Sequence, residues 1–314
     1  MKPMLAESST ANTVAHQPAA PRVDPRLILS LAAVYVIWSS TYLAIRIALV
    51  DLPPLLSASL RFVAAGLVLL AIAKRRGAAW PSAREWLAIV PIGGLLFLGG
   101  NGMVVLAQQT VSSGGAAVVC ATMPLWMGVL GVVSGDRPSR REWLSLAIGF
   151  VGVFVLMGGP TLAGKPHHIV MLMLSPACWA LGSVLARRLK GPSAKDSFML
   201  PAMQMLVGGA LLFAVAALRG ERIPTDASAS SWLAVGYLWL AGSLLGFTAY
   251  SWLLRNARPV VATSYAYVNP ILAVVIGAAI SGEPLGITTA IANVLIVGAV
   301  WLALRRPRAG DTPK

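Results

Sequence analysis

Residues 35–49 read YVIWSSTYLAIRIAL, an apolar run that also carries aromatic rings, hydroxyl groups and an arginine. A second run, SPACWALGSVLARRL at residues 175–189, resembles it. At an offset of 141 residues, the aligned pairs are Trp38 with Trp179, Tyr42 with Ser183, and Arg46 with Arg187. The two runs predict that the chain contains one helical unit twice.

The composition is typical of a membrane protein. Of 314 residues, 57% are hydrophobic and 11% are charged, whereas a soluble domain has about 25% charged residues. The net charge of +14 falls between apolar runs and forms no patch of the kind that binds nucleic acid, so we expect no nucleic-acid partner. Cys120 and Cys178 have neither metal-ligand spacing nor a disulfide framework, so we expect no metal and no cofactor.

Ten runs are long enough to cross a bilayer, which takes about 20 mostly apolar residues. They are 27–48, 54–73, 85–107, 113–133, 141–158, 168–186, 197–218, 232–254, 260–281 and 285–304. The expected fold class is therefore an all-α integral membrane protein with ten transmembrane helices. Residues 1–25 lack the apolar core of a signal peptide and are expected to form a disordered tail.

The basic residues predict the orientation in the membrane. If the N-terminus is cytoplasmic, 20 of the 25 Lys and Arg fall in inside segments and three fall in outside loops. This asymmetry follows the positive-inside rule and accounts for most of the net charge. We therefore expect a cell inner (plasma) membrane protein whose tails, residues 1–25 and 306–314, are both cytoplasmic.

The repeat extends beyond the opening run. Residues 121–138 and 267–284 align at an offset of 146, which pairs Pro124 with Pro270; one residue of slip then pairs Asp136 with Glu283. In the second span, Arg61 and Gly66 align with Gln204 and Gly209 at an offset of 143. The predicted repeats are 26–160 and 166–305. Each holds five spans, an odd number, so the second is inverted relative to the first. Inverted repeats are typical of transporters with a substrate site near the midplane, here a central cavity between the halves.

Several motifs carry a family resemblance: WSSTYLAIRIAL, PPLLSASLRFVAAG, GNGMVVLA, SGGAAVVCATMPL, ATSYAYVNPILAVVIG and SGE. In this order they resemble the EamA-type members of the drug/metabolite transporter superfamily, over about residues 27 to 305. The resemblance implies ten helices around a central cavity and export of small metabolites, amino acids or drugs. It does not identify a substrate.

Trp38, Tyr42 and Arg46 are spaced i, i+4 and i+8, so they share one helical face. We interpret this stripe as a cavity wall, and the aligned Trp179 and Ser183 as its counterpart. The alternative is aromatic helix packing, with the arginine extending to the outer interface.

Arg61 lies seven residues inside the second span, roughly 10 Å from its outer end. A charge at this depth costs about 2.5–3.5 kcal/mol on insertion scales, so it should face the protein interior or water. It could attract a substrate carboxylate or phosphate. Alternatively, it could pair with Asp51 or with backbone carbonyls. Asn101, between glycines, could line the cavity or bond across helices.

The other candidates come from the remaining spans near the cavity. Candidate substrate contacts are Trp126, Phe247, Tyr250, Tyr265 and Asn269, with helix packing as the alternative for the aromatic residues. Pro124 and Pro270 are candidate helix bends, because proline removes a backbone hydrogen bond. Asp136 and Glu283 are candidate gate residues, with turn formation as the alternative.

The ionisable residues limit the mechanism. No predicted span has an Asp, Glu, Lys or His well inside it, and arginine does not release a proton. This favours facilitated export or exchange over carboxylate-based proton antiport, and an anionic, zwitterionic or neutral small-molecule partner over a bare cation. The chain has no nucleotide-binding or hydrolase motif, so we expect that the protein is not an enzyme. The alternatives are an open channel and a non-transporting membrane scaffold.

Overall fold

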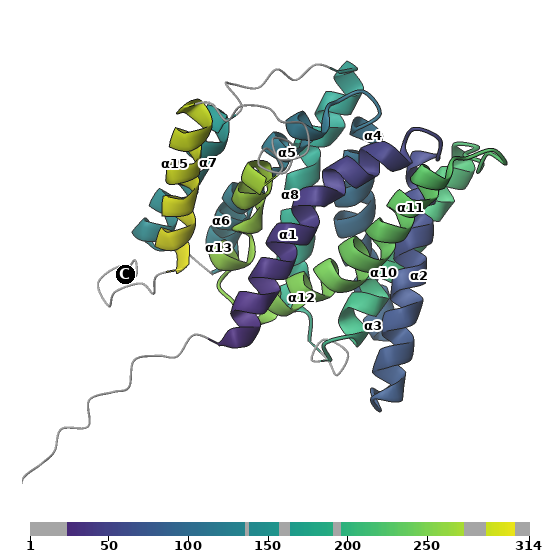
Figure 1. Cartoon of the computed structure of the whole chain (residues 1–314). Helices are drawn as coiled ribbons and strands as arrows, with labels where there is room; N and C mark the ends of the chain where they lie inside the picture. The colour runs from purple at the N-terminus through teal and green to yellow at the C-terminus, as the bar shows by residue number, and fades with distance from the viewer. Residues whose placement is uncertain (1–23, 136–137, 157–163, 191–195, 273–286, 305–314) are drawn as a thin grey trace, which may run out of the picture.

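The computed structural model describes residues 24–135, 138–156, 164–190, 196–272 and 287–304, and within these ranges it is helical without strands (Figure 1). The elements are α1 (Pro25–Ala48), α2 (Pro54–Arg75), α3 (Ala83–Gly93), η1 (Gly94–Gly102), α4 (Met103–Ala107), α5 (Ser113–Cys120), α6 (Met123–Ser134), α7 (Arg140–Leu156), α8 (Pro166–Arg188), α10 (Met199–Leu218), α11 (Ala229–Tyr237), η2 (Leu238–Gly246), α12 (Phe247–Asn256), α13 (Pro259–Ala262) and α15 (Ile287–Leu304).

Seven helical stretches in the described residues are long and apolar enough to cross a membrane. They are Pro25–Ala48, Pro54–Arg75, Ala83–Ala107, Gly115–Ser134, Pro166–Arg188, Met199–Leu218 and Ala229–Asn256. Each matches one of the ten predicted spans. The predicted fifth span is α7, with 17 residues, and the tenth ends in the apolar stretch Val294–Leu304 of α15. The predicted ninth span, 260–281, and both tails extend outside the described residues.

Local sequence sets where the helices begin. Proline occupies the first turn of α1, α2 and α8, where its missing N–H costs no hydrogen bond. Side-chain oxygens cap other starts by accepting backbone N–H bonds, from Ser82 at α3, Ser112 at α5 and Ser228 at α11. These polar caps divide an otherwise apolar chain into separate helices.

The predicted third and eighth spans are not continuous α-helices. Each contains a nine-residue π-helix, η1 in one and η2 in the other, and the two segments are offset by 144 residues. The spacing of apolar residues does not distinguish a π-helix from an α-helix here, so the sequence predicted uninterrupted spans. The π-helices lie beside the central cavity described below, as such segments often do at functional sites.

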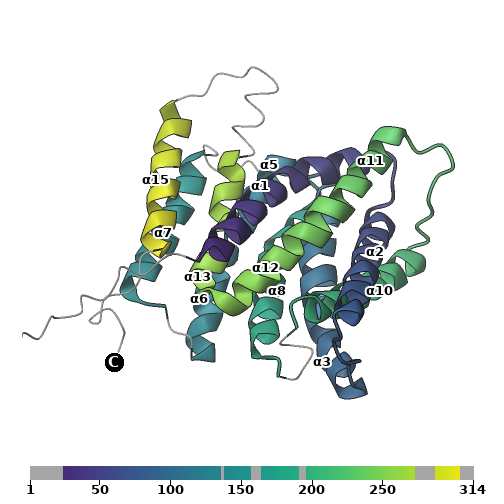
Figure 2. The same cartoon turned by 60° about the horizontal axis from the view of Figure 1, so that its bottom comes forward.

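Aligned helices of the two halves pack on each other. The α2–α10 pair lies at one side of the molecule and the α7–α15 pair at the other (Figures 1 and 2). A Cβ on Gly66 would lie 2.8 Å from Leu206 Cγ, and one on Gly209 would lie 2.7 Å from Val63 Cγ2. At the offset of 143, these are the same contact made twice. The glycines let the two helices approach closely.

The aligned helices also run in opposite directions. In Figure 1, α1 begins at the lower side of the molecule and ends near the top, whereas α8 begins near the top and ends below. Likewise α2 runs downward and α10 upward.

The two ends of the helices differ in charge. We call the lower side of Figure 1, where α1 begins and α2, α8 and α12 end, the basic face. Its described basic residues are Arg26, Lys74, Arg75, Arg76, Arg84, Arg140, Arg141, Arg187, Arg188, Lys190, Arg255 and Arg258. The opposite face, where α1 ends, carries Arg46, Lys165, Arg219 and Arg222.

Candidate functional site

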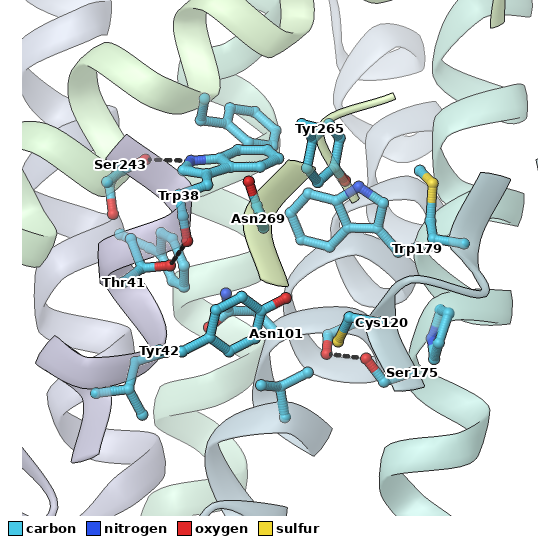
Figure 3. A pocket seen from close by; sticks show the side chains of 18 of the residues that line it. Trp38, Thr41, Tyr42, Asn101, Cys120, Ser175, Trp179, Ser243, Tyr265 and Asn269 are labelled. Carbon is cyan, nitrogen blue, oxygen red and sulfur yellow. Dashed lines mark hydrogen bonds between the residues drawn. The ribbon is translucent and has the colours of Figure 1, made fainter. Parts of the chain in front are cut away.

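A central cavity of about 100 Å³ lies between the two halves, lined by side chains from α1, α2, η1, α8, η2 and neighbouring segments (Figure 3). Eight of the predicted contact residues line it: Trp38, Tyr42, Arg61, Asn101, Trp179, Phe247, Tyr265 and Asn269. Along α1 the lining runs from Trp38 to Ile45, which is toward the opposite face.

Trp38 is held from three directions. Its indole Nε1 donates to the Gly242 carbonyl of η2 at 3.1 Å. The Tyr265 ring meets it edge-on, with 4.8 Å between centroids. A Cβ on Gly246 would lie 2.5 Å from Trp38 Nε1, so only glycine fits there. The first half thus places its tryptophan against the π-helix of the second half.

Trp179 has the reciprocal arrangement. It packs against Gly100 of η1, where a Cβ would lie 2.6 Å from Trp179 Cε3. Its ring stands edge-on to Trp38, with 5.7 Å between centroids. The sequence-aligned tryptophans therefore meet, each packed on a π-helix of the other half. Offset and edge-to-face ring pairs of this kind add about 0.5–1.5 kcal/mol beyond area burial.

Arg61 brings a buried positive charge to the cavity. Its side chain is 5% exposed, and Nη2 donates to Asn101 Oδ1 at 2.6 Å. The guanidinium carbon lies 4.3 Å from the centroid of the Phe62 ring. The expected alternative partner, Asp51, bonds elsewhere, to Ser228 and Ser231 at the start of α11. The pairing with an uncharged amide leaves the charge of Arg61 unneutralised by these contacts.

Ser183 and Tyr250 do not line the cavity, contrary to the prediction. Both are fully buried behind Trp179. The Tyr250 hydroxyl accepts from Trp179 Nε1 at 3.1 Å and lies 2.8 Å from Ser183 Oγ. These two bonds hold the Trp179 ring in place. Ser183 follows Trp179 by four residues, but its side chain contacts Tyr250 of α12 and not the cavity.

Arg46 is also absent from the lining and is exposed. At 3.6 residues per turn, two steps of four residues rotate a side chain by about 80°. The face that begins at Trp38 has therefore turned out of the cavity by Arg46.

Trp126 is 41% exposed. The buried stripe of α6 includes Met123 and Met127, which leaves Trp126 on the outer face. Whether Arg46 or Trp126 contacts a substrate in another state stays a prediction.

The candidate bends differ from each other. Pro124 opens α6 directly after a turn at residues 121–122, so the predicted fourth span is broken there. Pro270 lies in a helical stretch at residues 265–272, and the nearest turn in the described part of the chain, at 263–264, precedes it by several residues. Within residues 260–272, which the structure describes, the helix is therefore broken at the turn and not at the proline. Asp136 and Glu283 lie outside the described residues.

Three cavity hydroxyls escaped the sequence prediction: Thr41, Ser175 and Ser243. Thr41 Oγ1 donates to the Trp38 carbonyl, and Ser175 Oγ to the Gly100 carbonyl, both at 2.7 Å. Ser243 Oγ is buried and has no hydrogen-bond partner among the described residues. Ser175 precedes Trp179 by four residues and Ser243 precedes Phe247 by four, so the i, i+4 rule could have found both.

Two side-chain hydrogen bonds join the halves between the cavity and the basic face. The Tyr35 hydroxyl of α1 lies 2.6 Å from Ser264 Oγ. One helical turn further along, Ser39 Oγ donates to Asn269 Oδ1 at 3.1 Å. Both bonds join the two halves at or below the level of Trp38. These bonds hold the two halves together along this seam, on the side of the cavity that faces the basic face.

Comparison with known proteins gives four concordant findings. A family model described as "EamA-like transporter family" matches residues 26–158 and again 167–305. The chain is 42% identical over 274 residues to the "Uncharacterized inner membrane transporter YedA" of Escherichia coli strain K12, covering 87% of this chain and 89% of YedA. It is 25% identical over 281 residues to "Protein PecM" of Dickeya dadantii, covering 87% and 92% of the two chains. A protein of known crystal structure, 22% identical, shares the fold with a TM-score of 0.71 over 88% of this chain and 96% of the other.

Proposed function

Because the chain belongs to the EamA-like transporter family, we propose that it exports small anionic, zwitterionic or neutral organic solutes by alternating access. The solute binds in the central cavity, between the two halves. One observation carries this proposal: the buried Arg61 lines the same cavity as the paired tryptophans, and its Nη2 lies 2.6 Å from Asn101 Oδ1. A buried charge in a membrane protein is costly and usually marks a functional site.

We further infer that the two halves form an inverted repeat. The opposite directions of α1 and α8, and of α2 and α10, support this inference. So does the contact made twice by Gly66 and Gly209. Two similar bundles of opposite orientation can exchange conformations, and the exchange opens the site to each side in turn.

The charge of the site supports the proposed solute class. Among the described residues that line the cavity, Arg61 is the one formal charge. At an effective dielectric constant of 20, a cation about 5 Å from it would be repelled by roughly 3 kcal/mol. Attraction of the same cation to an aromatic ring face would offset about 0.5–2 kcal/mol of this repulsion. Repulsion exceeds attraction, so a bare organic cation is disfavoured and a carboxylate is favoured.

The basic face is, in this proposal, the cytoplasmic one. Its twelve described Lys and Arg residues agree with the positive-inside rule. The bonds of Tyr35 with Ser264 and of Ser39 with Asn269 then close the cytoplasmic side of the site. Loading from the cytoplasm requires these bonds to break.

A reversible lock at this seam tests the mechanism. In a background without native cysteines, Tyr35→Cys and Ser264→Cys are joined by a reducible thiol cross-linker, and counterflow is measured in proteoliposomes. We expect saturable counterflow that the lock abolishes and reduction restores. The single-cysteine variants, treated with the same reagent, control for modification alone. Undiminished flux in the locked protein would contradict alternating access, and flux without counterflow would indicate a channel.

A further inference from the structure

Ser243 leaves a hydrogen-bonding group free at the cavity. The residue is 1% exposed, and its Oγ has no hydrogen-bond partner among the described residues. A buried hydroxyl without a partner is destabilising, and native proteins rarely keep one without a reason. The two other cavity hydroxyls missed by the sequence prediction, on Thr41 and Ser175, already donate to backbone carbonyls.

The π-helix η2 positions this hydroxyl. The carbonyl of the preceding residue, Gly242, accepts a hydrogen bond from Trp38 Nε1, and this bond fixes the backbone next to Ser243. Phe247, four residues later, lines the same cavity. The free hydroxyl therefore stands beside an aromatic wall, and a bound solute could meet both (Figure 3).

The charged end of the cavity restricts what can accompany a carboxylate. Asn101 Oδ1 is already taken by Arg61, and the described lining contains no Asp or Glu. An ammonium group would therefore be close to the guanidinium without an acid to offset the repulsion. A neutral hydroxyl or keto group meets no such repulsion, and the serine hydroxyl can donate to it or accept from it.

The cavity has room for a small molecule. An engineered cavity of about 150 Å³ holds one benzene, which has six non-hydrogen atoms. The present cavity, at about 100 Å³, suits roughly four to six non-hydrogen atoms in this conformation. A solute of this size can be in contact with more than one wall at once.

We propose that the central cavity binds short carboxylates that carry a neutral hydroxyl or keto group, such as two- and three-carbon hydroxy and oxo acids. The carboxylate binds Arg61, the second oxygen bonds to Ser243, and the carbon skeleton packs on Trp38 and Phe247. The inference rests on the proposed transport function and narrows its solute class. Ser243 is the specificity-determining residue, and it selects against zwitterions and plain fatty acids of the same size.

Three ligands that differ in one group test this proposal on the purified full chain. L-lactate, propionate and L-alanine carry a hydroxyl, a hydrogen and an ammonium at the same carbon. Their dissociation constants follow from ligand-dependent shifts in the unfolding temperature. We expect lactate to bind about three- to tenfold more tightly than propionate, the range for one hydrogen bond, and alanine to bind most weakly. Equal binding of lactate and propionate, stronger binding of alanine, or no binding of lactate would overturn the proposal.

Variants of Ser243 locate the effect. Ser243→Ala should equalise lactate and propionate, while Ser243→Thr, which keeps the hydroxyl, should retain the preference. Ser145→Ala is the matched control, because Ser145 is equally buried but donates to the Ala299 carbonyl between α7 and α15. A preference unchanged in Ser243→Ala would refute the assigned role. Counterflow in proteoliposomes distinguishes failure of the solute class from failure of the transport function. If other organic anions show counterflow but lactate does not bind, only the solute class is refuted. If lactate binds but no solute shows counterflow, the transport function is refuted.

Discussion

At the scale of single residues, the site depends on Arg61. A guanidinium that is 5% exposed and bonded to one amide keeps donors for a ligand, because it has five N–H groups and Asn101 Oδ1 takes one bond. Its planar fork matches a carboxylate better than an ammonium would. Depth in the second span indicated Arg61 from the sequence, but its partner did not follow, because the sequence contains no information on which helix lies opposite.

Replacing Arg61 by Gln should weaken transport of carboxylates by about ten- to hundredfold, the range for one lost charged hydrogen bond. Neutral solutes should lose much less. Uptake into proteoliposomes at matched protein content measures both. Arg61→Lys, which keeps the charge without the fork, should fall between the two. Equal losses for carboxylates and neutral solutes would mean that Arg61 has a structural role only.

Other residues mark the limits of prediction from sequence. Trp38 and Trp179 were found because a repeated tryptophan in an apolar run is visible without a structure. Arg46 does not line the cavity in this structure, because a spacing of four residues drifts around the helix. The i, i+4 spacing to Phe247 could have placed Ser243 at the cavity. The state of its hydroxyl could not be predicted, because a serine among apolar residues looks the same whether its hydroxyl bonds its own helix or has no partner.

At the scale of elements, the two π-helices organise the cavity. Each brings a glycine against the tryptophan of the other half, Gly246 on Trp38 and Gly100 on Trp179. The hydrophobic pattern predicted the spans that contain η1 and η2 but not their winding, since nothing in the residue spacing distinguishes a π-helix from an α-helix here.

A methyl group added at Gly246 should destabilise the protein and weaken solute binding. The new Cβ would overlap the Trp38 indole at 2.5 Å, and overpacking of this kind costs about 1–3 kcal/mol. Gly298→Ala on α15 is the matched control, because nothing lies within 4 Å of its added Cβ. Thermal unfolding of the two variants in detergent checks this. A Gly246→Ala protein as stable as Gly298→Ala would show that the close packing is unimportant.

Asp51 joins the loop after α1 to the start of α11. Hydrogen bonds from Ser228 and then Ser231 lower the pKa of this carboxyl below its usual 3.8. A group whose pKa is lower in the folded state stabilises that state fully above its unfolded pKa and loses the contribution as the pH falls through the folded value. The contribution should therefore be complete above about pH 5 and decline below about pH 4.

Asp51→Asn should remove this pH-dependent contribution. Relative to wild type, the variant should be less stable at neutral pH, and the gap should narrow as the pH falls below about 4. Unfolding temperatures of the two proteins from pH 7 to pH 3 provide the measurement. A gap that is constant across this range would contradict the assigned hydrogen bonds.

At the scale of the whole molecule, two similar halves enclose one cavity. The family resemblance drawn from the sequence motifs is confirmed by the family match and by the 42% identity to YedA. The offset of 143 between Gly66 and Gly209 predicted which helices correspond, and α2 and α10 do pack together. The exact set of ten spans was only partly recovered, because α7 and the apolar stretch of α15 are short and the ninth predicted span leaves the described residues.

Cys120 offers a direct test of the central claim that one cavity is reached from each side in turn. This thiol lines the cavity, and Cys178→Ala would leave it as the single native cysteine. In sealed vesicles, a membrane-impermeant thiol reagent should label Cys120 from either side. Once Tyr35→Cys and Ser264→Cys are cross-linked, labelling should proceed only from the side opposite the basic face. Equal labelling from both sides of the locked protein would contradict the account.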